Sequence, residues 1–279
     1  VQDSLGCTFR AMSEAADNAG PNRLAGISAA KDCFYSGDIA SAISDASRNV
    51  DGILDKSDLE NYEPKYSEPV GTTYLGYGVH GHSTWTQGPV LQQALNILEC
   101  FDLKSMGHNS VEYIHTVTEA LKLALADREA FYGDPDFASV PVDGLLSKQY
   151  ASERSKEIDP MKAYPGMPSY GNPWAYSGLH GEVSPQPSYD SGGPMDLQHE
   201  SGTTHITVMD AHGNMACSTP SGGAFNKSVF FPELGFAIST RSEMLNFVEG
   251  HPNVVKPGKR PRTTIINYCL LYTSDAADE

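Results

Sequence analysis

The stretch that most constrains the fold of this chain lies at residues 201–225, where short runs of alternating side chains flank a turn-forming cluster. It reads SGTTHITVMDAHGNMACSTPSGGAF. Ile206 and Val208 alternate with polar or flexible residues, and the cluster at residues 210–214 contains Asp, Gly and Asn. Two such runs joined by such a cluster predict a β-hairpin. On this pattern alone, Thr203 is the first residue of a strand.

The first half of the chain has the periodicity of helices, because apolar residues recur there at intervals of three and four. We expect helices at residues 7–19, 23–35, 38–49, 55–62, 88–98 and 110–132, and paired strands at 69–80. In the helix at 110–132 the expected buried stripe comprises Ile114, Val117, Leu121 and Leu125. Its outer face is expected to carry Glu119, Lys122 and Arg128. Helices followed by strands predict an α+β fold.

Residues 159–202 differ in composition from the segments on either side. Pro, Gly, Ser, Tyr and Met dominate there, and no periodicity is visible. A connection of roughly forty residues is too long for an ordinary loop within a compact domain. We therefore expect a mobile linker between a part with helices and strands at 1–158 and a strand-rich part at 203–268. A spacer between two separate domains is the alternative.

The charge of the chain argues against two classes of partner. The formal net charge is −16 and 39% of the residues are hydrophobic. Such a chain can bury a substantial core, but its charge repels nucleic acid and anionic membranes, so we expect neither as a partner. A local basic island is formed by Lys256, Lys259, Arg260 and Arg262. It is either simply solvated or placed beside an acidic substrate.

The cysteines and the C-terminal end of the chain say little about function. The cysteines are Cys7, Cys33, Cys100, Cys217 and Cys269, and their spacing matches no metal-binding or redox motif. We therefore expect no metal and no cofactor, and the compartment (cytoplasmic, periplasmic or extracellular) stays open. Residues 269–279, CLLYTSDAADE, read like a translated sequencing adapter. We expect this segment to be foreign to the native protein, with a short acidic tail as the alternative.

A longer pattern surrounds the hairpin. A Thr-Thr-His strand, an Asp-x-x-Gly-Asn turn and a Thr-Pro-Ser-Gly-Gly run follow one another at residues 203–223. This pattern resembles the start of the small subunit of the γ-glutamyltransferases, in particular of their bacterial branch. Similar segments lie at residues 234–244 and 251–264, and late large-subunit segments are resembled by residues 68–103 and 119–147. The resemblance covers most of residues 7–264.

The resemblance implies a fold and a processing step. The family has the αββα sandwich of N-terminal-nucleophile hydrolases, with two stacked antiparallel sheets between helices, and this chain would hold part of it, truncated at both ends. The family's precursor cuts itself in front of a threonine, which here places the cut between Gly202 and Thr203. The large and small subunits of one precursor would then be partners. Ser221 falls where the family has a hydroxyl residue that positions the catalytic threonine; a polar strand end is the alternative.

A threonine at a new N-terminus can serve as both nucleophile and base. Its hydroxyl is a poor nucleophile unless a base takes the proton. The α-amino group that autocleavage would free on Thr203 has an unperturbed pKa of about 7.7 to 8.0, so part of it is free base at neutral pH. The threonine therefore needs no histidine to activate it.

The resemblance also implies how a small-molecule γ-glutamyl or acyl-amide substrate is bound. Thr263 and Thr264 fall on a hydroxyl pair that contacts the substrate's α-carboxylate, although hydroxyls after a proline are also ordinary turn formers. Arg241 occupies the loop that holds the glutamyl group in many members, and a guanidinium suits a carboxylate. Two positions depart from the family, since Gly223 replaces an asparagine and Leu245 an aspartate that holds the substrate's amine.

Three functions stay open at this point. The first is a γ-glutamyl amide hydrolase or transferase of the glutathione hydrolase type. The second is a related amidase or a cephalosporin- or glutaryl-type acylase, and the third is an uncleaved, non-catalytic homologue. The resemblance places an arginine for the glutamyl carboxylate before Val1 and the Gly-Gly oxyanion donors after Tyr268. We therefore expect this chain by itself to be inactive, with the function belonging to a longer parent protein.

Overall fold

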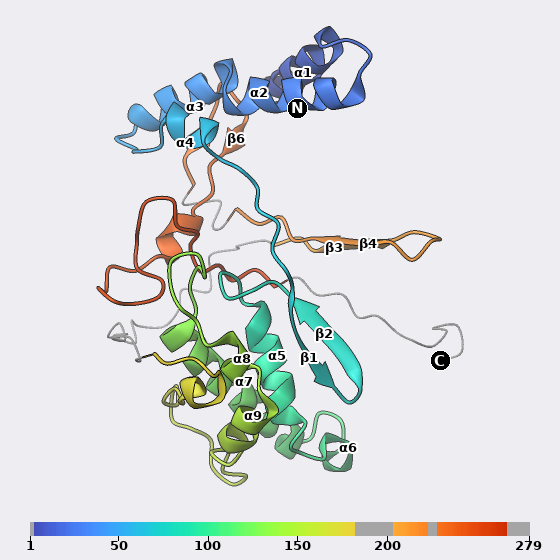
Figure 1. Cartoon of the computed structure of the whole chain (residues 1–279), viewed down its shortest axis with the longest axis vertical. Coiled ribbons are helices and arrows are strands. Elements are labelled where there is room, and N and C mark those ends of the chain that lie inside the picture. The colour runs from blue at the N-terminus through green and yellow to red at the C-terminus, as the bar shows by residue number, and fades with distance from the viewer. Residues whose placement is uncertain (1–2, 182–202, 223–227, 267–279) are drawn as a thin grey trace. The chain divides into compact units, whose positions relative to one another are not determined.

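The computed structural model describes residues 3–181, 203–222 and 228–266 (Figure 1). They form two compact units, of which the first contains residues 3–66, 222 and 228–240 and the second contains residues 67–181, 203–221 and 241–266. Helices and strands both occur, in agreement with the α+β prediction. The unit boundary near residue 66 matches none of the segment boundaries expected from composition, because segments far apart in sequence pack together within each unit. The expected division at 158, 202 and 268 concerns precursor processing and stays a prediction.

The first unit, in its described part, combines helices with a short strand pair. The helices are α1 (Asp3–Asn18), α2 (Arg23–Tyr35), α3 (Asp38–Arg48) and α4 (Lys56–Glu60), and the antiparallel strands are β5 (Phe230–Phe231) and β6 (Phe236–Ala237). Asp55 caps α4 by accepting the backbone N–H groups of Ser57 and Asp58. Ile39 and Ile43 share a buried cluster with Phe231 and Leu234. The core of this unit therefore joins a helix to strands from much later in the sequence.

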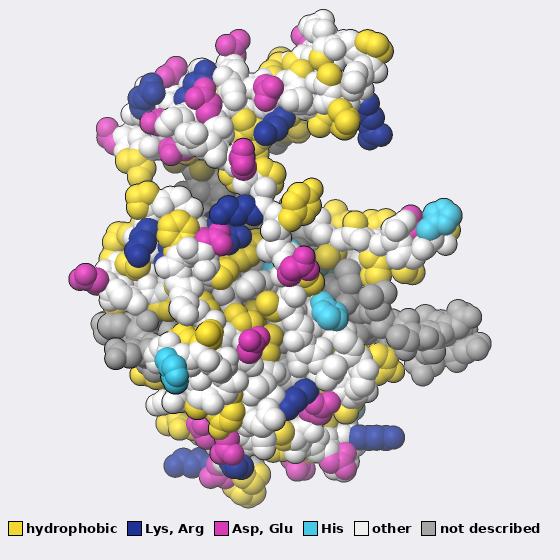
Figure 2. All heavy atoms as spheres, viewed as in Figure 1, with side chains coloured by type: hydrophobic (Ala, Val, Ile, Leu, Met, Phe, Trp, Pro, Cys, Tyr) yellow, Lys and Arg dark blue, Asp and Glu magenta, His cyan; other side chains and the backbone are white. Residues whose placement is uncertain are grey.

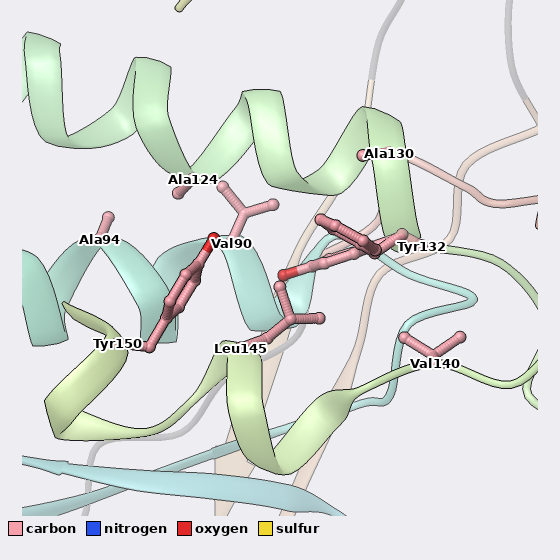
Figure 3. Close-up of a cluster of buried hydrophobic side chains, with 9 residues drawn as sticks. Val90, Ala94, Ala124, Ala130, Tyr132, Val140, Leu145 and Tyr150 are labelled. Carbon is pink, nitrogen blue, oxygen red and sulfur yellow. The ribbon is translucent and has the colours of Figure 1, made fainter. Parts of the chain in front are cut away.

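The second unit is organised around the long helix α7 (Val111–Phe131), which packs against α5 (Gly88–Leu98). Shorter elements complete it, namely α6 (Leu103–Met106), α8 (Val142–Leu145), α9 (Lys148–Ser155) and the 3-10 helix η1 (Pro173–Tyr176). Figure 3 shows the main buried cluster, which comprises Val90, Ala94, Ala124, Ala130, Phe131, Tyr132, Val140, Leu145 and Tyr150. Small alanines on α5 and α7 let the two helices approach closely.

The buried face of α7 differs from the stripe expected on it. Val117 and Leu125 do pack against the core, but Ile114 is 53% exposed and Leu121 is 38% exposed. Polar residues take the buried positions instead, namely Glu119, Asp127 and Arg128. Each has partners, as buried polar groups require. Apolar periodicity located this helix but misplaced its buried face.

Residues 159–181, the first half of the expected linker, are held against the helices. Tyr164 N donates to Glu119 Oε2 at 3.1 Å, and Gly171 N donates to Asp127 Oδ1 at 2.9 Å. Arg154 Nη2 donates to the carbonyl of Ser169 at 2.9 Å. A segment without periodicity is thus held by hydrogen bonds of its backbone, and the mobility of the linker stays a prediction. Residues 182–202 lie outside the described residues.

Two hairpins lie in the second unit, both as predicted. Strands β1 (Val70–Tyr74) and β2 (Tyr77–Gly81) pair antiparallel, and Gln92 of α5 donates to carbonyls in both strands, Val70 O at 2.8 Å and Val79 O at 3.0 Å. Strands β3 (Ile206–Met209) and β4 (Met215–Ser218) pair with Met209 opposite Met215. Asp210 closes that turn by accepting backbone N–H groups of His212 and Asn214 at 2.8 and 2.9 Å. The hydrogen bond from the Asn214 side chain, at 2.8 Å, is the main cause that lowers the pKa of the Asp210 carboxyl, and the backbone N–H groups add to it.

Across the described residues the strands form three separate two-stranded sheets. The two stacked sheets expected of the whole sandwich are not assembled within this part of the chain. No described helix is long and apolar enough to cross a membrane. The same residues contain no cluster of three or more His, Cys, Asp or Glu side chains suited to a metal ion.

Candidate active site

Pairing of β3 with β4 brings Thr203 and Ser221 together from the two open ends of the hairpin. Ile206 lies opposite Ser218, and beyond this pair Thr204 N donates to Pro220 O at 3.5 Å. One step further out, Thr203 Oγ1 and Ser221 Oγ are 3.0 Å apart. A strand register thus places two hydroxyl groups in hydrogen-bond contact although 18 positions separate them in the sequence.

Arg241 joins this pair from the 3-10 helix η3 (Arg241–Met244). Its Nη2 donates to Ser221 Oγ, and its Nε donates to Ser221 O at 3.4 Å. On its other side, Nη1 donates to Thr264 Oγ1 at 2.9 Å. Four of the residues singled out in the sequence, Thr203, Ser221, Arg241 and Thr264, therefore form one chain of hydrogen bonds.

Thr263, which the sequence also singled out, does not take part in this chain of hydrogen bonds. It is buried, its backbone N donates to Trp85 O at 2.9 Å, and its hydroxyl lies 3.5 Å from the same carbonyl. The adjacent hydroxyls of Thr263 and Thr264 thus do not act as a pair in this structure, because successive residues of an extended chain face opposite sides. Gly202 and Gly223 lie outside the described residues. Leu245 is half-buried just beyond η3.

His205, the histidine of the Thr-Thr-His pattern, links the two strands of the hairpin beside Thr203. Its Nδ1 is 2.7 Å from Thr219 Oγ1, and its Nε2 is 2.9 Å from Thr207 Oγ1. Thr219 lies two positions before Ser221, so His205 links the beginning of one strand to the end of the other. The motif contains His205 and Thr219, but their contact follows only from the cross-strand register.

Three of the four residues of the basic island, Lys259, Arg260 and Arg262, have protein partners. Arg260 makes a bidentate pair with Asp134, with Nε–Oδ2 at 3.1 Å and Nη2–Oδ1 at 2.6 Å. Burial by itself would raise the pKa of Asp134, but the hydrogen bonds from Arg260 outweigh it and lower that pKa. Lys259 donates to Pro252 O, and Lys256 is exposed. The island mainly anchors its loop to the protein.

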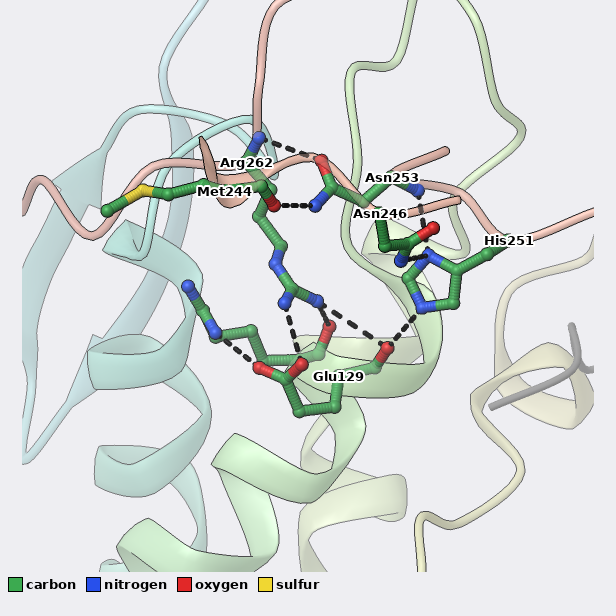
Figure 4. Close-up of polar contacts among 7 residues, drawn as sticks. Glu129, Met244, Asn246, His251, Asn253 and Arg262 are labelled. Carbon is green, nitrogen blue, oxygen red and sulfur yellow. Dashed lines mark hydrogen bonds and ion pairs between the residues drawn. The ribbon is translucent and has the colours of Figure 1, made fainter. Parts of the chain in front are cut away.

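A buried polar network holds the loop at residues 246–262 against the end of α7 (Figure 4). Arg262 Nη2 donates to Glu129 Oε2 at 2.6 Å and Nη1 donates to Arg128 O at 2.9 Å. Asn253 accepts from Arg262 N at 2.9 Å and donates to Met244 O at 2.6 Å, at the end of η3. The network therefore positions both η3, which carries Arg241, and the segment that carries Thr264.

The hydrogen bonds of this network favour one neutral tautomer of His251. Its Nδ1 accepts from Asn253 N at 2.9 Å and lies 2.8 Å from Asn246 Nδ2. The ring proton is therefore on Nε2, which faces Glu129 O at 2.9 Å. Burial lowers the pKa of His251, and the nearby Arg262 adds to this effect. A neutral histidine is thus built into the loop, in a supporting position and away from the hydroxyl chain.

Comparison with known proteins places this chain in a family. The family model described as Gamma-glutamyltranspeptidase matches residues 13–277. The chain therefore belongs to the gamma-glutamyltranspeptidase family, as its motifs had indicated. The match extends into the tail at residues 269–279, which lies outside the described residues, and the foreign origin of that tail stays a prediction.

Two named proteins and one solved structure illustrate what the chain is similar to. The chain is 34% identical over 239 residues to the acylase ACY 1 proenzyme of Pseudomonas sp. (strain SE83), covering 84% of this chain and 38% of that protein. It is 31% identical over 239 residues to the glutathione hydrolase proenzyme of Bacillus subtilis (strain 168), covering 84% of this chain and 39% of that protein. The crystal structure of a cephalosporin acylase from Bacillus halodurans superposes with a TM-score of 0.68 at 31% identity, covering 88% of this chain and 39% of the acylase.

These similarities define the fold class of the chain and the share of its relatives' length that it spans. The chain has the α+β fold of the N-terminal-nucleophile hydrolases, and it spans less than half the length of these three relatives. Both curated relatives are named as proenzymes.

Proposed function

We propose that the parent protein is a γ-glutamyl amide hydrolase or transferase, and that this chain carries its nucleophile, Thr203. The observation that best supports the proposal is the 3.0 Å contact between Thr203 Oγ1 and Ser221 Oγ, at the position where the family motif puts the cut. A hydroxyl that is already oriented by a second hydroxyl requires little rearrangement before it attacks. The names of the relatives, glutathione hydrolase and acylase, are compatible with this chemistry.

Autocleavage would come first. Thr203 Oγ attacks the carbonyl carbon of Gly202, a C–O bond forms, and the peptide C–N bond between the two residues breaks. The hydroxyl proton passes to the departing nitrogen, which becomes the free α-amine of Thr203. Water then hydrolyses the ester, which leaves a carboxylate on Gly202 and restores the hydroxyl. A glycine before the cut suits this attack because it lacks a Cβ.

Turnover would repeat the same attack on a substrate. The free amine of Thr203 accepts the hydroxyl proton while Oγ bonds to the carbonyl carbon of the γ-glutamyl amide. The amide C–N bond breaks, the leaving amine takes the proton, and an acyl ester remains on Thr203. Water or the amine of an acceptor amino acid attacks this ester and releases the product. Ser221 contributes by holding Oγ1 in place.

One observation favours a second candidate, an acylase that prefers a side chain without an amine. Leu245 is half-buried where γ-glutamyl-specific members have an aspartate for the substrate's ammonium group. An apolar residue offers this cation no acceptor. The 34% identity to an acylase proenzyme agrees with this alternative.

Mass spectrometry of the purified parent protein tests the proposal. We expect two polypeptides, with a new N-terminus at Thr203, and a single unbroken chain without amidase activity for Thr203→Ala. Thr204→Ala is the matched control and should still be cut, since Thr204 contacts Pro220 through its backbone. An unbroken wild-type chain would support the non-catalytic homologue, and a cut in Thr203→Ala would refute the assignment of the nucleophile.

Acyl specificity is tested with two chromogenic anilides, γ-glutamyl and glutaryl, which differ only in the α-amine. Faster release from the γ-glutamyl anilide supports the first candidate, and faster release from the glutaryl anilide supports the acylase. Leu245→Asp should raise the preference for the γ-glutamyl anilide by about tenfold, because a carboxylate would pair with the ammonium group. An unchanged ratio would show that Leu245 does not face the substrate.

A further inference from the structure

The guanidinium of Arg241 already contacts protein acceptors, whereas a residue that binds a substrate carboxylate would direct its donors toward the substrate. Each of its three nitrogen atoms faces a protein acceptor: Nε faces Ser221 O, Nη1 faces Thr264 Oγ1, and Nη2 faces Ser221 Oγ. Nη1 also lies 3.7 Å from Met244 Sδ. Two of these acceptors belong to Ser221, so the guanidinium fixes both the backbone and the side chain of that serine. The planar fork of an arginine suits such a two-point contact, and a lysine does not.

Hydrogen-bond chemistry then gives the contact a direction. A guanidinium is a donor only, so Ser221 Oγ must accept from Arg241. Ser221 Oγ keeps its own proton, which it can donate to its other neighbour, Thr203 Oγ1, at 3.0 Å. A hydroxyl that accepts from a cation becomes a stronger donor, because hydrogen bonds in a chain polarise one another. The proton of Thr203 is then free to leave toward a base.

We propose that Arg241 is a positioning residue that activates Thr203 through Ser221, and that it does not bind the substrate's carboxylate. The proposal rests on the function proposed above. As Thr203 Oγ1 loses its proton and attacks, negative charge that remains on this oxygen is stabilised by the serine O–H, and the arginine charge supports that donor. Thr264 holds the guanidinium from the other side at 2.9 Å.

Autocleavage provides a test that separates the two roles, because this reaction has no external substrate. In the parent protein, Arg241→Gln should slow the appearance of the two fragments at least about tenfold, as expected when a charge-assisted donor is lost. Arg241→Lys should also cleave itself slowly, since a lysine keeps the charge but cannot contact both oxygens of Ser221. An arginine that only bound substrate would leave autocleavage at the wild-type rate and raise KM alone. That result would overturn the proposal.

A double-mutant cycle tests whether the effect passes through Ser221. In a Ser221→Ala background the chain of hydrogen bonds is already broken, so adding Arg241→Gln should change the rate of autocleavage less than about twofold. Ser221→Thr keeps a hydroxyl and should retain the sensitivity to Arg241→Gln. If the two losses simply multiply in the double variant, Arg241 acts by another route and the proposal fails.

The pH profile distinguishes activation from general damage to the fold. Loss of a nearby positive charge raises the pKa of the base that takes the proton of Thr203, so the rate profile of Arg241→Gln should move to higher pH. A damaged fold lowers the rate at every pH without moving the profile, and that outcome would refute activation. Arg48→Gln is a matched control, because Arg48 is exposed on α3 and pairs locally with Asp45 at 2.9 Å. It should cleave like the wild type.

Failure of this inference can be told apart from failure of the proposed function. If Thr203→Ala stays uncut and Arg241→Gln cleaves normally, the nucleophile stands and the role of Arg241 is wrong. If wild-type protein is never cut under any condition, the proposed function itself falls, and the role of Arg241 falls with it.

Discussion

The helical part of the second unit and the hairpin that carries Thr203 both rely on polar contacts, but the two sets differ in burial. Asp127 on α7 is fully buried and accepts from Gln93 at 2.9 Å and Tyr150 at 2.8 Å, with Arg154 at 3.4 Å. Burial raises the pKa of Asp127, against the opposing effect of Arg154. The hydroxyls of Thr203 and Thr264 are exposed. The scaffold is therefore fixed by contacts that are costly to lose, whereas the hydrogen bonds of the candidate site are exposed or only partly buried.

The largest effect on stability is expected from the buried ion pair of the scaffold. Arg154→Ala leaves Asp127 without its charged partner and should lower the free energy of unfolding by about 3 to 5 kcal/mol. Urea denaturation measures this loss. Lys156→Ala, which removes an exposed pair with Glu153 at the end of the same helix, should cost less than about 0.5 kcal/mol. Equal losses for the two variants would contradict the contrast between buried and exposed contacts.

A close backbone approach gives the next largest effect. A Cβ on Gly144 of α8 would lie 2.0 Å from Pro173 O of η1, so Gly144→Ala forces the two segments apart. We expect a loss of about 1 to 3 kcal/mol, the range typical of overpacking, visible as a lower Tm. A Cβ on Gly166 would meet nothing within 4 Å, and Gly166→Ala is the control that should leave Tm nearly unchanged. If Gly144→Ala leaves Tm unchanged, residues 159–181 are less firmly anchored than the hydrogen bonds indicate.

A smaller, pH-dependent effect is expected at His251, between the scaffold and the site. Its folded pKa is lowered by burial, so the unfolded chain binds the proton more readily. The stability that neutral His251 provides is complete above its unfolded pKa of about 6.5 and is lost as pH falls through the lower folded value, by at most about 1.4 kcal/mol per pH unit. The stability advantage over His251→Gln should therefore shrink on acidification in thermal unfolding. A constant advantage between neutral and mildly acidic pH would argue against this explanation.

The smallest effect is expected on the hairpin. Thr207→Val removes one exposed contact with His205, at 2.9 Å, while keeping a β-branched side chain suited to a strand. The free energy of unfolding should change by less than about 0.5 kcal/mol. A loss comparable to that of Arg154→Ala would mean that the hairpin contributes to the scaffold, and the comparison between the two regions would need revision.

Much of the candidate site was accessible from the sequence because long motifs surround it. Thr203, Ser221, Arg241 and Thr264 were all singled out, and they form one hydrogen-bonded chain. Their roles in catalysis and binding stay predictions. The sequence could not predict that Arg241 contacts Ser221. A guanidinium can bind a carboxylate or the two oxygens of a serine, and the sequence does not show which of these two acceptors it meets. The supporting contacts of His205 and His251 were missed for the same reason.

By itself the sequence determined many local elements of this protein: the turn at Asp210, the helices α1 to α5 and α7, and the pairing of β3 with β4. Each of these depends on preferences that act between near neighbours. Only the tertiary structure decided which charged side chains are buried, as with Asp127 and Arg262, and where residues 159–181 lie. A charge can be buried only when a partner reaches it, and here those partners come from distant segments, as when Arg262 reaches Glu129.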